Sequence, residues 1–297
     1  MVLNRLRYLL NYIKAFRQIQ PLSAYDLLKY LLNMLGLCTI PVLRRIFLLR
    51  RRYPQILPFD FVVKIPSLNN CLFYVPRGKD GAILFGFIRK MPNYEPKTRA
   101  LLNSILCPGD VFIDIGAHIG YYTITMSRRV GSTGRVIAVE PCLGKYLRMN
   151  VQLNRLENVF ISEKAAYHSK GCIRLAVGGS LCGRIYPSES YPILSWKLVQ
   201  AAPLDDIFAE SGCPLKSIKA LKVDVEGAEY DVLAGATKTL ERTEYVIFEA
   251  WDRNFKNVSA CIELLRLKGF RVSVLERFNG YANLLAARAP NAQNVRY

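Results

Sequence analysis

The chain has 297 residues, of which 51% are hydrophobic and 22% charged, and its formal net charge is +18 at pH 7. This length accommodates one α/β domain of ordinary size together with an extension. No run of about 18 apolar residues occurs, which argues against a membrane-spanning helix. The eight cysteines form no C-x-x-C pair, so neither a zinc site nor a disulfide scaffold is expected. We therefore expect a reduced, cytoplasmic protein, and "MVLNRLRYLL" at the start lacks the cleavage site of a signal peptide.

The positive charge is concentrated in the first third of the chain. Residues 1–110 contain 17 Lys and Arg against 5 Asp and Glu, whereas residues 111–297 contain 24 against 18. Such a basic segment attracts phosphate, whether on a lipid, a nucleic acid or a substrate. The charge alone does not choose between these partners.

Residues 1–91 are predicted to be a basic helical extension that also contains short strands. Apolar residues recur every three or four positions from Leu3 to Phe16 and again from Leu27 to Leu35, and a third helix leads into "RRIFLLRRR" at 44–52. Short strands are expected over residues 59–90. The favoured interpretation is a helical cap packed on a catalytic domain. The alternative is an interfacial helix that contacts the anionic inner face of a membrane.

Residues 92–297 alternate between strand and helix patterns and are predicted to be the catalytic domain. Pro96 begins a helix that Pro108 ends. A polar stretch separates the third strand from the fourth, and Asn279-Gly280 indicates a closing hairpin. Strands are expected at 111–114, 135–140, 159–162, 218–225 and 244–250, with helices at 119–130, around 146–156, at 228–240 and at 257–268. This order predicts an α/β fold with a mostly parallel sheet and helices on both faces.

The stretch "VFIDIGAHIGYYT" at 111–123 ends a buried strand with an acid and then makes a glycine turn. Its glycines follow G-x-x-x-G spacing and not the G-x-G-x-x-G of dinucleotide sites. This pattern favours S-adenosylmethionine, whose sulfonium and α-ammonium groups are cationic. Asp114 is suited to organise the ammonium, and Gly116 is expected to let the backbone approach the cofactor. The plain alternative is an ordinary strand–turn–helix connection.

Glu140 ends the second strand, 26 positions after Asp114. An acid in this place accepts hydrogen bonds from the ribose hydroxyls of a bound nucleoside. Dehydrogenases share the feature, so it indicates a nucleoside and not a reaction. The alternative is a surface acid before Pro141.

The segment "LKVDVEGAEYDVL" offers candidate catalytic acids. Strand alternation predicts that Asp224 and Glu226 share one face near the end of the fourth strand. There they are suited to orient or deprotonate a hydroxyl nucleophile. The alternative role is helix capping, which accounts for Glu229.

These motifs together resemble the FkbM-type family of S-adenosylmethionine-dependent methyltransferases. The resemblance rests on "FIDIGAHIGYYT", "VIAVEP", "PLDDIF" and "LKVDVEGAEYDVLAGA", and it covers roughly residues 94–288. It implies a class I methyltransferase fold, with a seven-stranded sheet that ends in an antiparallel hairpin. It also implies methyl transfer to an oxygen of a sugar, a polyketide or another hydroxylated metabolite.

The resemblance also assigns residues by position. Glu140 falls on the ribose position, Ala165 on the adenine side, and Asp224 with Glu226 over the reaction centre. His118 stands where Asn is more usual, and we expect it to line the pocket and not to act as a base. The family's cofactor loop falls on five residues: Asp114, Ile115, Gly116, His118 and Gly120.

The sequence therefore predicts an O-methyltransferase that acts on a hydroxyl of a glycan, a lipid or a secondary metabolite. An RNA methyltransferase suits the charge, but the chain lacks an Asn- or Asp-Pro-Pro-aromatic block and a recognisable RNA-binding module, so nucleic acid is a disfavoured partner. Two further classes of protein fit less well. The intact glycine turn and Glu140 argue against a membrane-associated binding protein with a vestigial pocket, and the glycine spacing argues against a nicotinamide dehydrogenase. No metal is expected, because the acids lack a convincing third oxygen ligand.

Overall fold

The computed structural model describes residues 20–21, 60–178, 181–187, 193–214 and 217–288. The helices predicted over residues 1–52 lie outside these ranges. The chain forms two compact units, one of Met1–Tyr94 with Gln152–Asn154 and one of Glu95–Val151 with Arg155–Tyr297. The domain boundary proposed after residue 91 stays a prediction.

The first unit contains a three-stranded antiparallel sheet of β1 (Gln20–Pro21), β2 (Phe61–Ile65) and β3 (Cys71–Val75), with a 3₁₀ turn at Pro66–Leu68. Alternate residues of β2 and β3 are buried, as expected for a sheet with one packed face. Residues 78–88, however, form helix α4 (Gly78–Ile88), so the prediction of strands there was wrong. The buried residues of this helix recur at helical spacing: Gly81, Leu84, Phe85 and Ile88.

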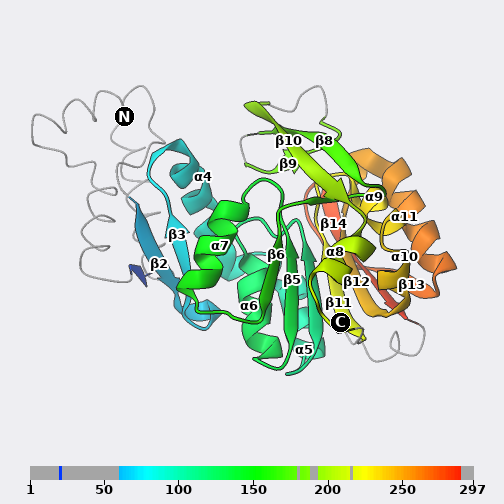
Figure 1. The fold of residues 1–297 in the computed structure, drawn as a ribbon, viewed down its shortest axis with the longest axis horizontal. Coiled ribbons are helices and arrows are strands. Elements are labelled where there is room, and N and C mark those ends of the chain that lie inside the picture. The colour runs from blue at the N-terminus through cyan, green and yellow to red at the C-terminus, as the bar shows by residue number, and fades with distance from the viewer. Residues whose placement is uncertain (1–19, 22–59, 179–180, 188–192, 215–216, 289–297) are drawn as a thin grey trace, which may run out of the picture. The chain divides into compact units, whose positions relative to one another are not determined.

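The second unit is built on the predicted seven-stranded sheet (Figure 1). Its strand order is β13-β14-β12-β11-β4-β5-β6. The five strands from β12 to β6 run parallel, and the hairpin of β13 and β14 adds antiparallel strands beside β12. The strands are β4 (Val111–Ile115), β5 (Arg135–Val139), β6 (Val159–Ser162), β11 (Ile218–Val223), β12 (Thr243–Trp251), β13 (Phe270–Arg277) and β14 (Tyr281–Arg288).

Helices cover both faces of this sheet, so its central strands β4 and β11 are buried on both sides. The odd-numbered residues of β4 pack in one core with residues of α8 to α11, whereas Asp114 faces α6 and bonds to Thr123 there. The helices are α5 (Pro96–Ile105), α6 (Tyr121–Val130), α7 (Gly144–Leu153), α8 (Leu204–Glu210), α9 (Glu229–Ala234), α10 (Thr237–Glu241) and α11 (Phe255–Leu267); short 3₁₀ turns lie at Met91–Asn93 and Asp252–Asn254.

The polar stretch between the third and fourth predicted strands contains a second sheet (Figure 1) that the sequence analysis missed. Its strand order is β7-β10-β8-β9, from β7 (Ala165–Ala166), β8 (Gly171–Val177), β9 (Gly183–Arg184) and β10 (Ser195–Ala202). One face packs on Leu175 and Val199, while Trp196 and Leu198 on the other face are exposed. The mixture of polar and apolar residues on the open face disguised the strands.

The single helix predicted at 228–240 is interrupted, and the structure has α9 and α10 instead. Gly235 lies at the interruption, where a Cβ would be 2.2 Å from the carbonyl oxygen of Tyr167. The chain bends because another segment packs directly on its backbone. In the part of the chain that the structure describes, no helix has the length and apolarity needed to span a membrane.

Candidate active site

The turn after β4 is a compact loop that links three strands. Gly116, His118 and Gly120 have φ angles of 79°, 53° and 94°, and the amides of Gly116 and Ala117 donate to the Val139 carbonyl at the end of β5. A Cβ on Gly116 would lie 1.8 Å from the carbonyl oxygen of Asp224, at the end of β11. We expected this glycine to admit the cofactor, but the space that it leaves is filled by the backbone of Asp224.

Glu140 holds the shape of this loop. Its Oε2 accepts a hydrogen bond from the His118 amide at 2.8 Å, and its Oε1 accepts from the amides of Cys142 at 2.7 Å and Leu143 at 2.9 Å. Burial raises the pKa of this carboxyl, which is 6% exposed. Within the described residues Oε2 accepts one bond, so an acceptor position remains for a ribose hydroxyl.

Asp114 lies within β4 and not beyond its end. It is 2% exposed, and its Oδ2 accepts a hydrogen bond from the Thr123 hydroxyl at 2.6 Å, which joins the strand to α6. Burial raises its pKa to about 6. The assignment of this carboxylate to the cofactor ammonium stays a prediction. Two other assigned residues, Ile115 and Ala165, have their side chains packed in hydrophobic clusters.

The candidate catalytic acids lie at the end of β11, and each is paired with a buried cation. Asp224 Oδ2 is 2.8 Å from Nζ of Lys222, while Glu226 forms an ion pair with Arg184 of β9. Burial alone would lower the pKa of Lys222, but the carboxylates of Asp224 and Glu95 raise it above its usual value. Glu226 has a raised pKa, first because it is buried and second because the charge of Asp224 lies nearby.

The alternation argument for these two acids was wrong in its geometry. Strand β11 ends at Val223, and Glu226 has a left-handed φ of 58°. The turn nevertheless keeps the two carboxylates close enough for one to raise the pKa of the other. Glu229 lies in the first turn of α9, and its carboxylate accepts the amide of Gly227, which precedes the helix, at 2.9 Å.

The structure adds site residues that the sequence analysis did not assign. Glu249, near the end of β12, is 7% exposed and accepts a hydrogen bond from the Trp251 indole. Burial and the charges of Asp224 and Glu226 raise its pKa well above its usual value. An acid inside the apolar run "VIFEAW" was the available signal. Arg184, by contrast, comes from the inserted sheet and had no local signal.

The carboxylates at this end of the sheet outnumber the cations. Lys222 and Arg184 face Asp224, Glu226 and Glu249 as well as other buried acids. A cofactor that carries a sulfonium and an ammonium fits such surroundings, because it supplies positive charge. Among the described residues, no cluster of three or more His, Cys, Asp or Glu could hold a metal ion.

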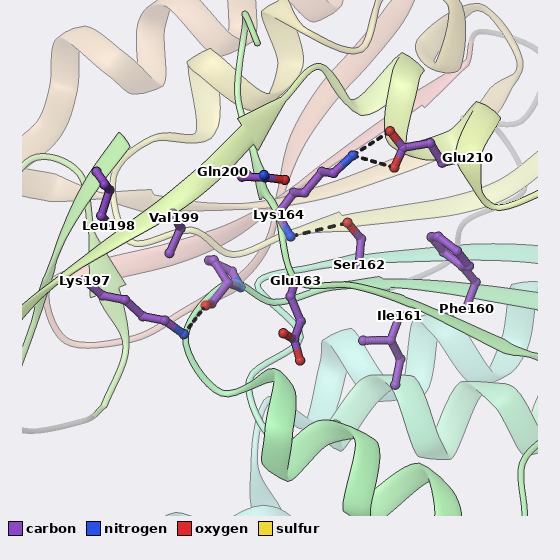
Figure 2. A pocket seen from close by; sticks show the side chains of 11 residues that line it. Phe160, Ile161, Ser162, Glu163, Lys164, Lys197, Leu198, Val199, Gln200 and Glu210 are labelled. Carbon is purple, nitrogen blue, oxygen red and sulfur yellow. Dashed lines mark hydrogen bonds and ion pairs between the residues drawn. The ribbon is translucent and has the colours of Figure 1, made fainter. Parts of the chain in front are cut away.

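A hollow of about 440 Å³ lies along β6 and β10 (Figure 2). Nζ of Lys197 reaches from β10 to the carbonyl oxygens of Pro141 at 2.6 Å and Cys142 at 3.2 Å, and so anchors the segment after Glu140. The acids at the end of β11 do not line it. Its lining residues are Pro141, Phe160, Ile161, Ser162, Glu163, Lys164, Lys197, Leu198, Val199, Gln200 and Glu210.

Known structures share this fold only distantly, and no curated protein sequence matches the chain. An O-methyltransferase from Thermotoga maritima is 17% identical over 68% of this chain and 71% of its own, with a TM-score of 0.41. A fibrillarin from Aeropyrum pernix with bound S-adenosyl-L-methionine is 14% identical over 77% of this chain and 94% of its own, with a TM-score of 0.42. TM-scores this low add no weight to the assignment.

The family assignment comes from the sequence. The family model described as "Methyltransferase FkbM domain" matches residues 114–272, which is more than half of the chain. The match includes the glycine loop, Glu140 and the acids at the end of β11, which the fold brings together. The chain therefore belongs to the FkbM methyltransferase family, and it is a methyltransferase with S-adenosylmethionine as its cofactor.

Proposed function

We propose that this methyltransferase transfers the methyl group to a hydroxyl oxygen of a glycan, a lipid or a secondary metabolite. One observation carries the proposal: the candidate catalytic acids adjoin the glycine loop. The Asp224 amide donates to the Ile115 carbonyl at 2.9 Å, and the Asp224 carbonyl fills the space beside Gly116. A nucleophile activated at these acids is then next to the cofactor loop.

The loop residues hold the cofactor in this proposal, and S-adenosylmethionine supplies an electrophilic methyl group on a cationic sulfur. Glu140 takes the ribose hydroxyls, while the turn from Ile115 to Gly120, including His118, follows the rest of the cofactor. Asp114 supports the turn through its bond to Thr123 of α6, which leaves the cofactor ammonium to another acid, and Ala165 is assigned to the adenine side. The main contribution of the protein is the alignment of acceptor and cofactor.

We assign Glu226 as the general base. Its raised pKa makes it a stronger proton acceptor than an ordinary carboxylate, and the Arg184 ion pair fixes its position. General base catalysis of this kind contributes about 10²–10⁴-fold to a rate. Asp224, which bonds to the Lys222 ammonium, orients the acceptor hydroxyl beside it.

The acceptor class can be tested with labelled methyl groups. Tritiated S-adenosylmethionine is incubated with the protein and a fractionated cell extract, and the Glu226→Gln variant serves as the background. The proposal expects label in a glycan, lipid or small-metabolite fraction, released under conditions that cleave methyl ethers. Label found in RNA alone would replace it with the nucleic-acid alternative that the net charge of +18 suits.

Membrane association through the basic N-terminal residues is a separate proposal. It concerns the part of the chain outside the described residues, and it rests on their charge. Sedimentation of the protein with anionic vesicles, compared with neutral ones, tests it directly.

A further inference from the structure

We propose that Glu95 binds the α-ammonium group of S-adenosylmethionine. This inference rests on the proposed function and adds a residue that lies before the matched family domain. It places one more carboxylate at the cofactor loop, contributed by the segment that leads into α5.

Glu95 is a buried carboxylate with a hydrogen-bond partner on only one of its two oxygens among the described residues. It is 1% exposed, and its Oε2 accepts a hydrogen bond from the Tyr122 hydroxyl at 2.6 Å. Its Oε1 is buried and has no hydrogen-bond partner among the residues that the structure describes. Leaving such an oxygen without a donor is unfavourable, so the free oxygen points to a ligand that donates.

The backbone at Glu95 is also strained. Its φ is 41°, a left-handed conformation that is unfavourable for a residue with a Cβ. The strain is retained directly before Pro96, where α5 begins. Strained residues of this kind gather at ligand sites, where the rest of the structure holds them in place.

The position of Glu95 matches one end of the cofactor. Tyr122 is in the first turn of α6, directly after the glycine loop, and Lys222 of β11 lies 3.9 Å from the Glu95 carboxylate. Glu140 follows β5, where the ribose is expected, and it contacts the loop at His118. Because β4 stands between β11 and β5, Glu95 is on the side of the methionine part.

The charge around Glu95 suits an ammonium group. Lys222 is 3.9 Å from Glu95 but 2.8 Å from Asp224, so its positive charge is engaged mainly with Asp224. An ammonium has three N–H donors and no acceptor, which matches an oxygen that needs a donor and a positive charge.

Two ligands separate ammonium binding from a merely structural role. S-adenosylhomocysteine carries the amino-acid part, whereas 5′-methylthioadenosine lacks it. Calorimetry with each ligand is done on the wild type, on Glu95→Gln and on the control Glu276→Gln. Glu276 is also a buried acid beside α5, but both of its oxygens accept bonds from Lys97 and Thr98.

We expect Glu95→Gln to lower the affinity for S-adenosylhomocysteine by about tenfold or more, since hydrogen bonds to charged groups are worth about 1.5–3 kcal/mol. Its affinity for 5′-methylthioadenosine should stay within about twofold, and the control should leave both affinities within about twofold. Equal losses for both ligands, or no loss for either, would overturn the assignment of Glu95.

If Glu95→Gln does not fold, Tyr122→Phe gives the second measurement, because it removes only the hydroxyl that holds Oε2. It should lower the affinity for S-adenosylhomocysteine more than the affinity for 5′-methylthioadenosine. Equal losses of affinity for the two ligands would again overturn the inference. A wild-type protein that binds neither ligand would instead be a failure of the proposed function.

Discussion

Replacing Lys222 with Met tests whether a buried ammonium holds the acids of the site together. Lys222 is 3% exposed, and its Nζ lies 2.8 Å from Asp224 and 3.9 Å from Glu95. Removing one partner of a buried ion pair costs about 3–5 kcal/mol. Because the Asp224 side chain is 21% exposed, we expect the lower end, about 3 kcal/mol at pH 7.

The matched control is Lys219→Met, on the same strand. Its Nζ is 2.7 Å from Glu244, but both side chains are about a quarter exposed, at 25% and 27%. Such a pair contributes about 0–1 kcal/mol. Urea unfolding followed by circular dichroism at pH 7 compares the two variants, and equal losses of unfolding free energy would refute the reasoning.

The pH dependence gives a second check on Lys222→Met. Burial already raises the pKa of Asp114 to about 6, and the Lys222 charge opposes this rise. Without the ammonium, Asp114 is protonated at a still higher pH. The cost of the substitution should therefore shrink as the pH falls from 7 to about 4, because Asp114 becomes neutral over this range. A cost that is the same at both pH values would show that lost packing is responsible.

The other predictions concern the reaction, the loop and the pH dependence of stability. Glu226→Gln and Asp224→Asn should each lower turnover by at least about 10²-fold while S-adenosylhomocysteine affinity stays within a few-fold, and wild-type turnover in either variant removes that residue from the mechanism. Gly116→Ala should cost more than about 3 kcal/mol by thermal unfolding, because its Cβ would lie 1.8 Å from a carbonyl oxygen. Gly212→Ala, also at positive φ (62°) but with open space around it, should cost about 1 kcal/mol or less. The pKa of Glu229 is raised from 4.5 to about 7 by burial, so the folded state binds this proton more tightly. Glu229 should therefore contribute about 3 kcal/mol to a fall in stability as the pH rises from about 4 to 7, and Glu229→Gln should remove that share of the slope.

The sequence was sufficient for the parallel sheet because strands β4, β5 and β12 are buried along almost their whole length and read as largely apolar runs. The closing hairpin was equally clear, because Asn279-Gly280 suits only a few turns. The inserted sheet was missed because one of its faces is open, so its strands carry exposed Trp196 and Leu198 among polar residues. The break at Gly235 depends on the Tyr167 backbone, which no local pattern can show.

The site was predictable where its residues follow strand ends in the chain. Glu140 and Asp224 were found in this way, since parallel strands bring their carboxyl ends to one edge. Other residues of the site come from elsewhere: Glu95 precedes α5, and Arg184, which pairs with Glu226, belongs to the inserted sheet. Pairing between such distant segments is set by the tertiary fold, so spacing along the chain could not reveal it.

The site carries more negative than positive groups although the chain as a whole is positive, and this contrast limits which acceptors fit the site. The chain carries +18, but the end of β11 gathers Asp224, Glu226 and Glu249 around two cations that are already paired. Burial and mutual repulsion raise the pKa values of Glu226 and Glu249, so the site gains from any positive group that enters it. A phosphate or carboxylate next to the reacting hydroxyl would meet the same repulsion. On the proposed reaction, the acceptor therefore presents a neutral or cationic end to these acids.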